Sequence, residues 1–439
     1  MKALFSLLLL CQALPSAGPD WTAVEKRAIE FLQTYIRIKT INPPADTREA
    51  AELFRAELAA NGLSPKIYTT GAAGQTNLVV RLPGRDRTKK PLLLLNHFDV
   101  VPVDPAAWRV DPFGGILRDG YIWGRGAMDM KGTGVIHLMS LITLKRMGIV
   151  PMRDIIMLCT SDEELGGDYG IRAMIRDHWP EIESEYVLDE GGFGSRDVFS
   201  PSRLAFGISV GEKQVAWVRL RAKGIAGHGS QPIPDNANLI LLEAIAKALA
   251  ALAQGKTNAA VEKMREMLKG RLAENKFTGA IQRNTISLTT LTSGVGSPVK
   301  VNVIPSNAEA TLDCRLLPGV NADEFVSEMK ARINDSRVTL ERVSEPSDPG
   351  ISRMETPLFD AMRTAILKFH PGAVVTPILI PYGTDSVRLR EKGVIAYGFT
   401  PMILDAATVA TMHSDEERIP IAEFYKGLRI FFELLKSDF

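Results

Sequence analysis

Two of the six histidines in this chain stand beside acidic residues, at points where an apolar run has just ended or a loop begins. His97 closes the run Leu92–Leu95 and precedes Asp99 by two positions, and His413 precedes two acidic residues near the C-terminus. Residues two apart on a strand share a face. His97 can therefore present one ring nitrogen to a metal while Asp99 orients the other. For His97 alone, a hydrogen-bonded core histidine is the favoured alternative.

Asp129 stands in a glycine-rich stretch, Gly-Arg-Gly-Ala-Met-Asp-Met-Lys-Gly, just before an expected helix. The glycines allow a tight turn that exposes the carboxylate. The same position suits an aspartate that caps the helix. A ligand site and a helix cap are equally good interpretations of this segment taken alone.

Further carboxylates follow two apolar strands. Asp162, Glu163 and Glu164 come directly after one, and Asp189 and Glu190 close the other. Ligands of open α/β sheets bind at the carboxyl ends of strands, and adjacent carboxylates repel one another unless a cation lies between them. A metal site is therefore favoured over a solvated charge run. Histidines combined with carboxylates form a ligand set that suits zinc.

Two more segments could bear function, although an ordinary turn competes in each. Gly224–Ser230 is a glycine-rich turn that lifts His228 away from its sheet, and a surface turn is its favoured interpretation. Tyr382–Ser386 could form an anion-holding nest of backbone N–H groups. His137, His178 and His370 stand in helical or loop contexts, and we assign them no role.

The elements that must position these residues alternate along the chain, which predicts an α/β sheet covered by helices. Apolar spacing predicts strands at 78–82, 92–96 and 154–160 and helices at 21–38, 48–60, 132–147 and 169–177. After the middle of the chain the same domain resumes, with a helix at 357–369, a strand at 393–398 and a closing helix at 421–435.

Between residues 211 and 345 the pattern changes to strand, helix, strand, strand, helix, strand, the order of a ferredoxin-like sandwich. The expected strands are 214–222, 285–290, 308–315 and 338–343, and the helices are 238–253 and 322–333. We therefore expect an inserted domain over 211–345 between two parts of a first domain, 19–210 and 346–439. Residues 255–276 are interpreted as a charged helical insertion with a solvated face.

The first eighteen residues have the layout of a signal peptide: Lys2, an apolar run, then small residues. The sequence predicts a secreted or periplasmic protein, and no segment has the apolar length of a membrane-spanning helix. Leu10 stands where a lipoprotein site needs a small residue, so we do not expect lipid at Cys11. Cys159 and Cys314 lie in apolar runs and are expected to be buried.

The charge composition limits the classes of binding partner to expect. Lys and Arg number 52 against 51 Asp and Glu, a formal net charge of +1. Such a balance gives no electrostatic reason to expect nucleic acid or an acidic membrane as a partner. The net charge does not exclude small polar molecules as substrates.

Taken together, these motifs resemble the M20 metallopeptidase family, which includes aminoacylases, acetylornithine deacetylase, succinyl-diaminopimelate desuccinylase and glutamate carboxypeptidase. The resemblance runs from about residue 25 to 437, in the family's order and spacing. It implies a three-layer α/β catalytic domain of the zinc-peptidase type and an inserted ferredoxin-like α+β domain that acts as a lid and in dimerisation.

The resemblance also implies a ligand set for two zinc ions, with cobalt or manganese as substitutes. Asp129 bridges the ions, His97 and Glu190 complete one site, and Glu164 and His413 complete the other. Glu163 is the implied general base and Asp99 the residue behind His97. Glu190 is preferred to the adjacent Asp189. A cis peptide is expected after the bridging aspartate.

Other family residues lie on or near the inserted domain. His228 matches a histidine that reaches a neighbouring active site across a homodimer and steadies the oxyanion, although Gly229 replaces the family's usual alanine. Asn302, Arg315, Gly383 and Thr384 resemble the family's grip on a substrate carboxylate, for which a guanidinium is well suited.

The resemblance implies hydrolysis of an amide bond next to a free carboxylate, in a short peptide or an N-acyl amino acid. No motif distinguishes a peptidase from a deacylase that lacks peptidase activity. A non-catalytic metal-binding scaffold, the alternative from another class, should lack Glu163 or a ligand, and this chain keeps all of them.

Overall fold

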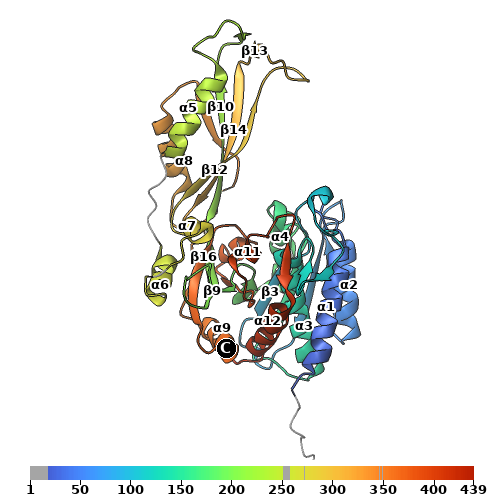
Figure 1. The fold of residues 1–439 in the computed structure, drawn as a ribbon. Coiled ribbons are helices and arrows are strands. Elements are labelled where there is room, and N and C mark those ends of the chain that lie inside the picture. The colour runs from blue at the N-terminus through green and yellow to red at the C-terminus, as the bar shows by residue number, and fades with distance from the viewer. Residues whose placement is uncertain (1–17, 251–257, 271, 346, 349) are drawn as a thin grey trace, which may run out of the picture.

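The fold was analysed in a computed structural model that describes residues 18–250, 258–270, 272–345, 347–348 and 350–439. The chain forms a large helix-covered sheet from which a smaller domain projects, as Figure 1 shows. The predicted signal peptide and Cys11 lie outside the described residues, apart from Gly18. Within the described ranges, no helix combines the length and hydropathy needed to cross a bilayer.

The large sheet has the strand order β1-β2-β6-β3-β7-β17-β9-β16, with β8 paired to β9. Strands β6, β3, β7 and β17 are mutually parallel. The carboxyl ends of these four strands therefore meet at one edge of the sheet. In chain order the strands are β1 (Lys66–Thr69), β2 (Thr76–Leu82), β3 (Leu92–His97), β6 (Ile155–Thr160), β7 (Tyr186–Asp189), β8 (Gly194–Ser195), β9 (Ala205–Glu212), β16 (Val374–Ile380) and β17 (Ile395–Gly398).

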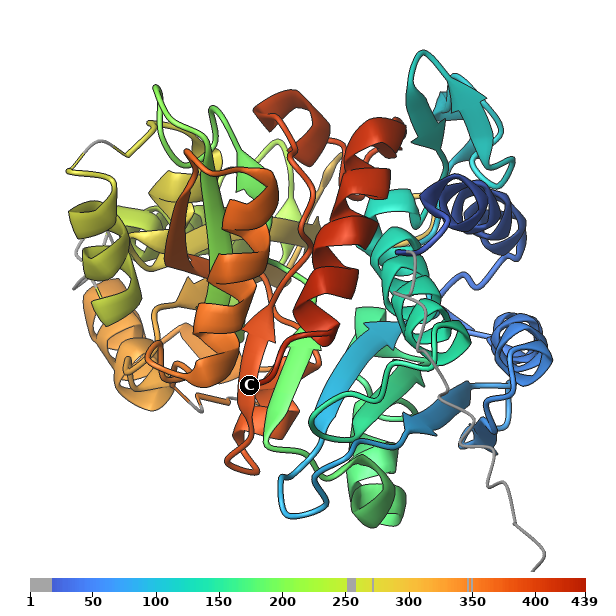
Figure 2. The ribbon, with the colours of Figure 1, turned by 90° about the horizontal axis from the view of Figure 1, so that it is seen from below.

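Both faces of this sheet are buried, which explains why its parallel strands are continuous apolar runs. Along β3, Leu92 and Leu94 pack on one face, and Leu93 and Leu95 on the other. Figure 2 shows the resulting layers, with helices on each side of the strands. The first face carries α1 (Trp21–Arg37), α2 (Arg48–Ala60), α3 (Gly132–Arg146), α9 (Pro357–Phe369) and α12 (Ile421–Leu435). The second carries α4 (Ile171–Ile182) and α10 (Ser386–Arg390).

The smaller domain confirms the predicted ferredoxin-like order. Its sheet runs β12-β14-β10-β15, with antiparallel pairing throughout, and two helices cover one face. A two-stranded pair, β11 and β13, lies at its far end (Figure 1). The elements are β10 (Gln214–Lys223), β11 (Gly227–His228), α5 (Ala237–Ala250), β12 (Thr285–Ser293), β13 (Val303–Ile304), β14 (Asn307–Leu316), α8 (Ala322–Ile333) and β15 (Val338–Arg342).

The predicted helical insertion within 255–276 is confirmed in the described part, but its other face is buried, which the prediction did not include. This stretch contains α6 (Ala259–Met267) and leads into α7 (Lys276–Ile281). Ala260, Val261 and Met264 are buried in the core of the large sheet rather than exposed. Their spacing places them on one helix face, which packs against β16.

Several elements were not foreseen from the sequence. Strands β9 and β16 extend the large sheet, and a three-stranded sheet, β4 (Ile116–Arg118), β5 (Tyr121–Trp123) and β18 (Arg418–Pro420), joins the N- and C-terminal parts. Helix α11 (Ala406–Val409) and the short turns η1 (Pro105–Ala107) and η3 (Glu163–Leu165) complete the description. Cys159 and Cys314 are buried free thiols, as predicted.

Candidate metal centre and active site

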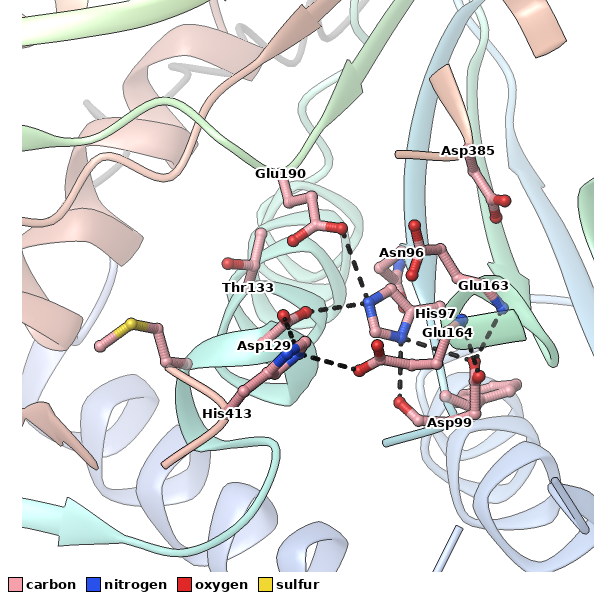
Figure 3. A network of polar contacts seen from close by, with 12 residues as sticks. Asn96, His97, Asp99, Asp129, Thr133, Glu163, Glu164, Glu190, Asp385 and His413 are labelled. Atoms are coloured by element: carbon pink, nitrogen blue, oxygen red, sulfur yellow. Dashed lines mark hydrogen bonds and ion pairs between the residues drawn. The ribbon is translucent and has the colours of Figure 1, made fainter. Parts of the chain in front are cut away.

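Three neighbouring parallel strands deliver polar side chains to one edge of the large sheet. His97 is the last residue of β3, Glu163 and Glu164 follow β6, and Glu190 follows β7. The strands bring these residues together because parallel strands end on the same side. Figure 3 shows the resulting cluster, which Asp129 and His413 complete from other segments.

Asp129 enters from η2 (Ala127–Lys131), the irregular segment between β5 and α3, and the Asp129–Met130 peptide is cis, as the resemblance implies. Gly126 precedes it with φ of +86°, where a side chain would be strained and would collide with Val100. Behind the loop, the buried Lys131 ammonium donates to the carbonyl oxygens of Tyr35 and Ile38 at 3.1 and 2.8 Å. The glycine-rich stretch is therefore a positioned loop, not a simple helix cap.

The two carboxylate oxygens of Asp129 face two different histidines. Oδ1 lies 3.1 Å from Nε2 of His97, and Oδ2 lies 2.9 Å from Nε2 of His413. Glu190 Oε1 lies 3.6 Å from the same nitrogen of His97, and Glu164 Oε1 lies 3.4 Å from that of His413. The structure thus places the five predicted ligands in two groups that share Asp129 (Figure 3).

Burial and charge crowding perturb every group in this cluster. Burial raises the pKa of Glu190 well above its usual range, and the charge of Asp129 adds to the effect. The same two causes raise the pKa of Glu164. Burial also opposes the charge of Asp129, but hydrogen bonds from His413 and His97 outweigh it and lower the pKa of that carboxyl. So many carboxylates in one buried place need positive charge to balance them.

The donor set fits a metal. One ligand atom each of His97, Asp129 and Glu164 lie within 4.8 Å of one another, and the same holds for His97, Glu163 and Glu190. Within the described parts of the chain, the buried Oε1 of Glu164 accepts no hydrogen bond of ordinary geometry, and its contact is the ion pair with His413 at 3.4 Å. Imidazole nitrogens and carboxylate oxygens at this density are the ligands of zinc and similar ions.

Glu190, rather than its neighbour Asp189, reaches the cluster. The Asp189 carboxylate turns away and accepts a hydrogen bond from the Ser386 hydroxyl at 2.7 Å. This difference follows from strand geometry, because consecutive side chains leave a strand on opposite faces.

Asp99 acts differently from the sequence expectation. The nearest partner of His97 Nδ1 is the backbone carbonyl oxygen of Asp99 at 2.9 Å, and the carboxylate lies at 3.5 Å. That carboxylate instead accepts hydrogen bonds from the backbone N–H groups of Glu163 and Glu164, at 3.2 and 3.1 Å. Asp99 therefore positions both acidic residues as well as the histidine.

Glu163 lies beside His97 and Glu190 at the inner side of the cluster (Figure 3). Burial raises its pKa well above the usual range of a glutamate. A carboxyl group in such surroundings is suited to accept and hold a proton. Asp162, the third acidic residue of the run, is not part of the cluster, since its carboxylate accepts from Asn42 Nδ2 and the Tyr169 N–H at 3.0 and 3.1 Å.

Sequence reasoning missed the buried pair that holds the Asp129 loop. Glu417 Oε2 accepts from Arg125 at 2.7 Å, and its other oxygen accepts from the backbone N–H groups of Met128 and Asp129 at 2.9 and 3.2 Å. The two charged side chains are almost wholly buried. No local signal could have found Glu417, because its partners lie nearly three hundred positions away.

Asn42 was also missed. Its side-chain amide donates to Asp99 at 2.8 Å and to Asp162, and so joins two acidic residues beneath the cluster. In the sequence it forms part of Asn-Pro-Pro, which indicates only a break between helices.

His228 and Asn302 lie together but remote from the cluster of their own chain. His228 belongs to β11, and the Gly229 N–H donates to the carbonyl oxygen of Asn302 at 2.8 Å. This pair of turns occupies the end of the small domain that points away from the large sheet (Figure 1). The exposed His228 ring contacts Ser230, whose hydroxyl lies 2.7 Å from Nδ1.

Arg315 and Gly383 each lie beside Val215, where the small domain joins the large one. Arg315 pairs with Val215 across the small sheet, and a Cβ on Gly383 would lie 3.8 Å from the Val215 side chain. The guanidinium is held by Asp313 through two hydrogen bonds of 2.7 and 3.1 Å. The Thr384 hydroxyl is engaged too, donating to the buried Glu212 at 2.7 Å.

Comparison with known proteins explains this arrangement. A model of "Peptidase family M20/M25/M40" matches residues 93–437. The chain belongs to this family. It is a metal-dependent hydrolase of that family, with the α/β fold and the smaller domain described above.

Several relatives cover nearly the whole protein. Aminoacylase-1 from Sus scrofa is 30% identical over 419 residues, covering 94% of this chain and 95% of that protein. A probable carboxypeptidase S-like 2 from Dictyostelium discoideum is 28% identical, covering 82% and 74%. Among solved structures, the M20 family metallo-carboxypeptidase Sso-CP2 from Sulfolobus solfataricus matches with a TM-score of 0.70 and 19% identity, covering 94% of this chain and 98% of that one.

Proposed function

We propose that this enzyme uses two zinc ions to hydrolyse an amide bond next to a free carboxylate, in an N-acyl amino acid or a short peptide. The observation that carries the proposal is the division of the cluster. Asp129 presents one oxygen to the His97 and Glu190 group and the other to the Glu164 and His413 group. A shared carboxylate between two such groups suits a pair of metal ions.

When bound, zinc supplies a Lewis acid for the scissile carbonyl and lowers the pKa of water. Glu163 takes the proton from the attacking water and passes it to the leaving amine. Asp99 keeps Glu163 in place through its backbone N–H group. The raised pKa of Glu163, caused mainly by burial, favours its holding that proton between the two transfers.

The proposal extends to a homodimer in which His228 completes the site of the second chain. Two features support it: the exposed His228 belongs to β11, which pairs with β13 at the end of the small domain away from the large sheet (Figure 1), and the small domain exposes several leucines. Strand β12 is an edge of its sheet and exposes Leu288 and Leu291, while α5 exposes Leu239, Leu242 and Leu249. An open edge beside exposed leucines is a surface typical of self-association.

The test is zinc-supplemented hydrolysis of N-acetyl amino acids and dipeptides, read by mass spectrometry, with Glu163→Ala as the control. Turnover of the first group alone makes the protein an aminoacylase, and turnover of the second alone makes it a peptidase. The names of the relatives, aminoacylase-1 and carboxypeptidase S-like 2, support both substrate groups. Failure to cleave dipeptides and N-acyl amino acids of every acyl length would refute the proposal.

We also propose that the protein is exported, because residues 1–18 have the layout of a signal peptide. N-terminal sequencing of the protein purified from its native source tests this. A first residue near Asp20 supports export, and an N-terminus at Met1 contradicts it.

A further inference from the structure

A pocket with apolar walls opens directly beside the metal cluster. Its walls include Met128, Phe193, Phe277, Leu404, Val409 and Met412. Glu190 also lines the pocket, and Met128 and Met412 adjoin Asp129 and His413 in the chain. The pocket is therefore continuous with the groups that surround the scissile bond.

One wall comes from an unexpected part of the chain. Phe277 belongs to α7, which lies between α5 and β12 of the small domain in sequence but packs on the large one. Its ring lies 5.8 Å from that of Phe193 and 5.7 Å from that of Phe199, centroid to centroid. Such edge-to-face aromatic contacts hold ring orientations well.

Hydrogen bonds fix this wall in place. The side-chain amide of Asn275, which caps α7, donates to the carbonyl oxygen of Val198 at 2.7 Å. The Ala273 N–H donates to the carbonyl oxygen of Phe199 at 3.1 Å. The end of the segment predicted as a charged helical insertion is therefore built into the large domain beside the pocket.

The charge of the pocket decides which part of a substrate it can take. All of its lining residues are described, and Glu190 is the one charged group among them. Glu190 is already assigned to the metal cluster, and the pocket walls carry no Arg, Lys or His side chain that could pair with a substrate carboxylate. Arg315 and Gly383, by contrast, lie at the domain junction. The carboxylate-bearing half of the substrate therefore belongs elsewhere, and the acyl half is left for the pocket.

We infer that this pocket receives an extended apolar acyl group, so that the preferred substrates are N-acyl amino acids whose acyl chain is longer than acetyl. The inference rests on the proposed function, since it concerns the same amide bond. Burial of a methylene group favours binding by up to about four-fold in the equilibrium constant. Selectivity should rise with chain length until the pocket is filled.

The experiment compares two substrate series. One varies the acyl group from acetyl through butyryl and hexanoyl to octanoyl on alanine, and the other varies the amino acid under a fixed acetyl group. We expect kcat/KM to rise at least about ten-fold from acetyl to hexanoyl. Val409→Asp, which places a charge in the pocket wall, should lower the hexanoyl-to-acetyl ratio by about ten-fold or more.

Two further variants keep the result interpretable. Ala407→Asp adds the same charge to an exposed position of the same helix α11, and it should leave the ratio unchanged. Val409→Thr keeps the shape of the side chain and adds only a hydroxyl group, so a drop in its ratio cannot come from misfolding. A flat acyl series in an enzyme that cleaves acetyl substrates overturns the pocket assignment, as does selectivity confined to the amino-acid series. Failure to cleave any amide refutes the proposed function itself.

Discussion

The two histidine-bearing regions of this protein differ in how complete they are within one chain. Around Asp129, two histidines and the carboxylates of Glu164 and Glu190 lie close together, with His–carboxylate contacts of 2.9–3.6 Å, and a buried ion pair holds the loop. The His228 ring, by contrast, is exposed, and within the described residues Ser230 is its hydrogen-bond partner. Its strand β11 pairs with β13 at the far end of the small domain. The half of the site proposed to bind metal is thus assembled within one chain, whereas His228, proposed to bind the oxyanion, is not near it.

This difference shows which contacts fix the side chains of the metal cluster and which could fix His228. The metal cluster is fixed by the ends of parallel strands and by buried polar contacts. In the proposed dimer, the His228 region would reach a substrate only through a second chain, and the exposed leucines of β12 and α5 offer a surface for that contact. Each prediction below tests one side of this comparison.

The largest effect is expected from Asp129→Ala. Removing the carboxylate that both groups share should abolish metal binding and leave no measurable turnover, because the remaining ligands belong to two separate sites. Metal content by mass spectrometry and hydrolysis of the best substrate measure both consequences. Asp162→Asn is the matched control, since Asp162 lies outside the cluster, and full metal content in Asp129→Ala would be inconsistent with its bridging role.

Glu163→Gln should lower kcat by about 10²–10⁴-fold, since an amide cannot take the proton from water. Metal content should stay at the wild-type value, because Glu163 is proposed as a base rather than a ligand. Loss of one metal ion from this variant would instead make Glu163 a metal ligand. This outcome is worth measuring because Glu163 lies close to His97 and Glu190.

Glu417→Ala should destabilise the fold by about 3–5 kcal/mol, because it leaves Arg125 charged and buried without its partner. Glu309→Ala in the small domain removes an exposed pair with Arg221 and should cost only about 0–1 kcal/mol. Denaturant unfolding of both variants measures the contrast. Equal losses would show that the Asp129 loop is not held in the way described.

His228→Ala should lower kcat by about 10²-fold and leave metal content unchanged, because it removes a group that stabilises the oxyanion. Mixing this variant with Glu163→Gln under exchange conditions should restore about a quarter of wild-type activity, since half of the random dimers carry one intact site. Absence of any recovery, with exchange verified by mass spectrometry, would argue against action across a dimer.

Much of this fold could be predicted because its strands and helices obey local rules. The parallel strands are apolar runs with two buried faces, and the bounds of α8, α9 and α12 match the apolar periodicity residue for residue. The prediction failed for α4, which was expected to end at Asp177 but continues to Ile182 through Pro180. His178 leaves helical geometry there, so Pro180 falls near the start of a new turn, where proline is tolerated.

The residues of the candidate site were predictable where a short sequence motif contains them. Strand ends and a glycine-rich loop made His97, Glu163, Glu164, Glu190 and Asp129 candidates, whereas the ligand set that adds His413 came from the family resemblance. Glu417 and Asn42 could not be found in this way, because their partners are set by tertiary contacts between distant segments. The role of α7 in the pocket was hidden for the same reason: a charged sequence conceals the apolar face that packs inward.

The most direct test of the account is a zinc titration of the metal-free enzyme, with activity and bound metal measured on the same samples. The account predicts that full activity requires two zinc ions per chain, and that Glu190→Ala and Glu164→Ala each stop at one. Full activity at one ion per chain, or metal binding unaffected by both substitutions, would contradict a centre shared through Asp129.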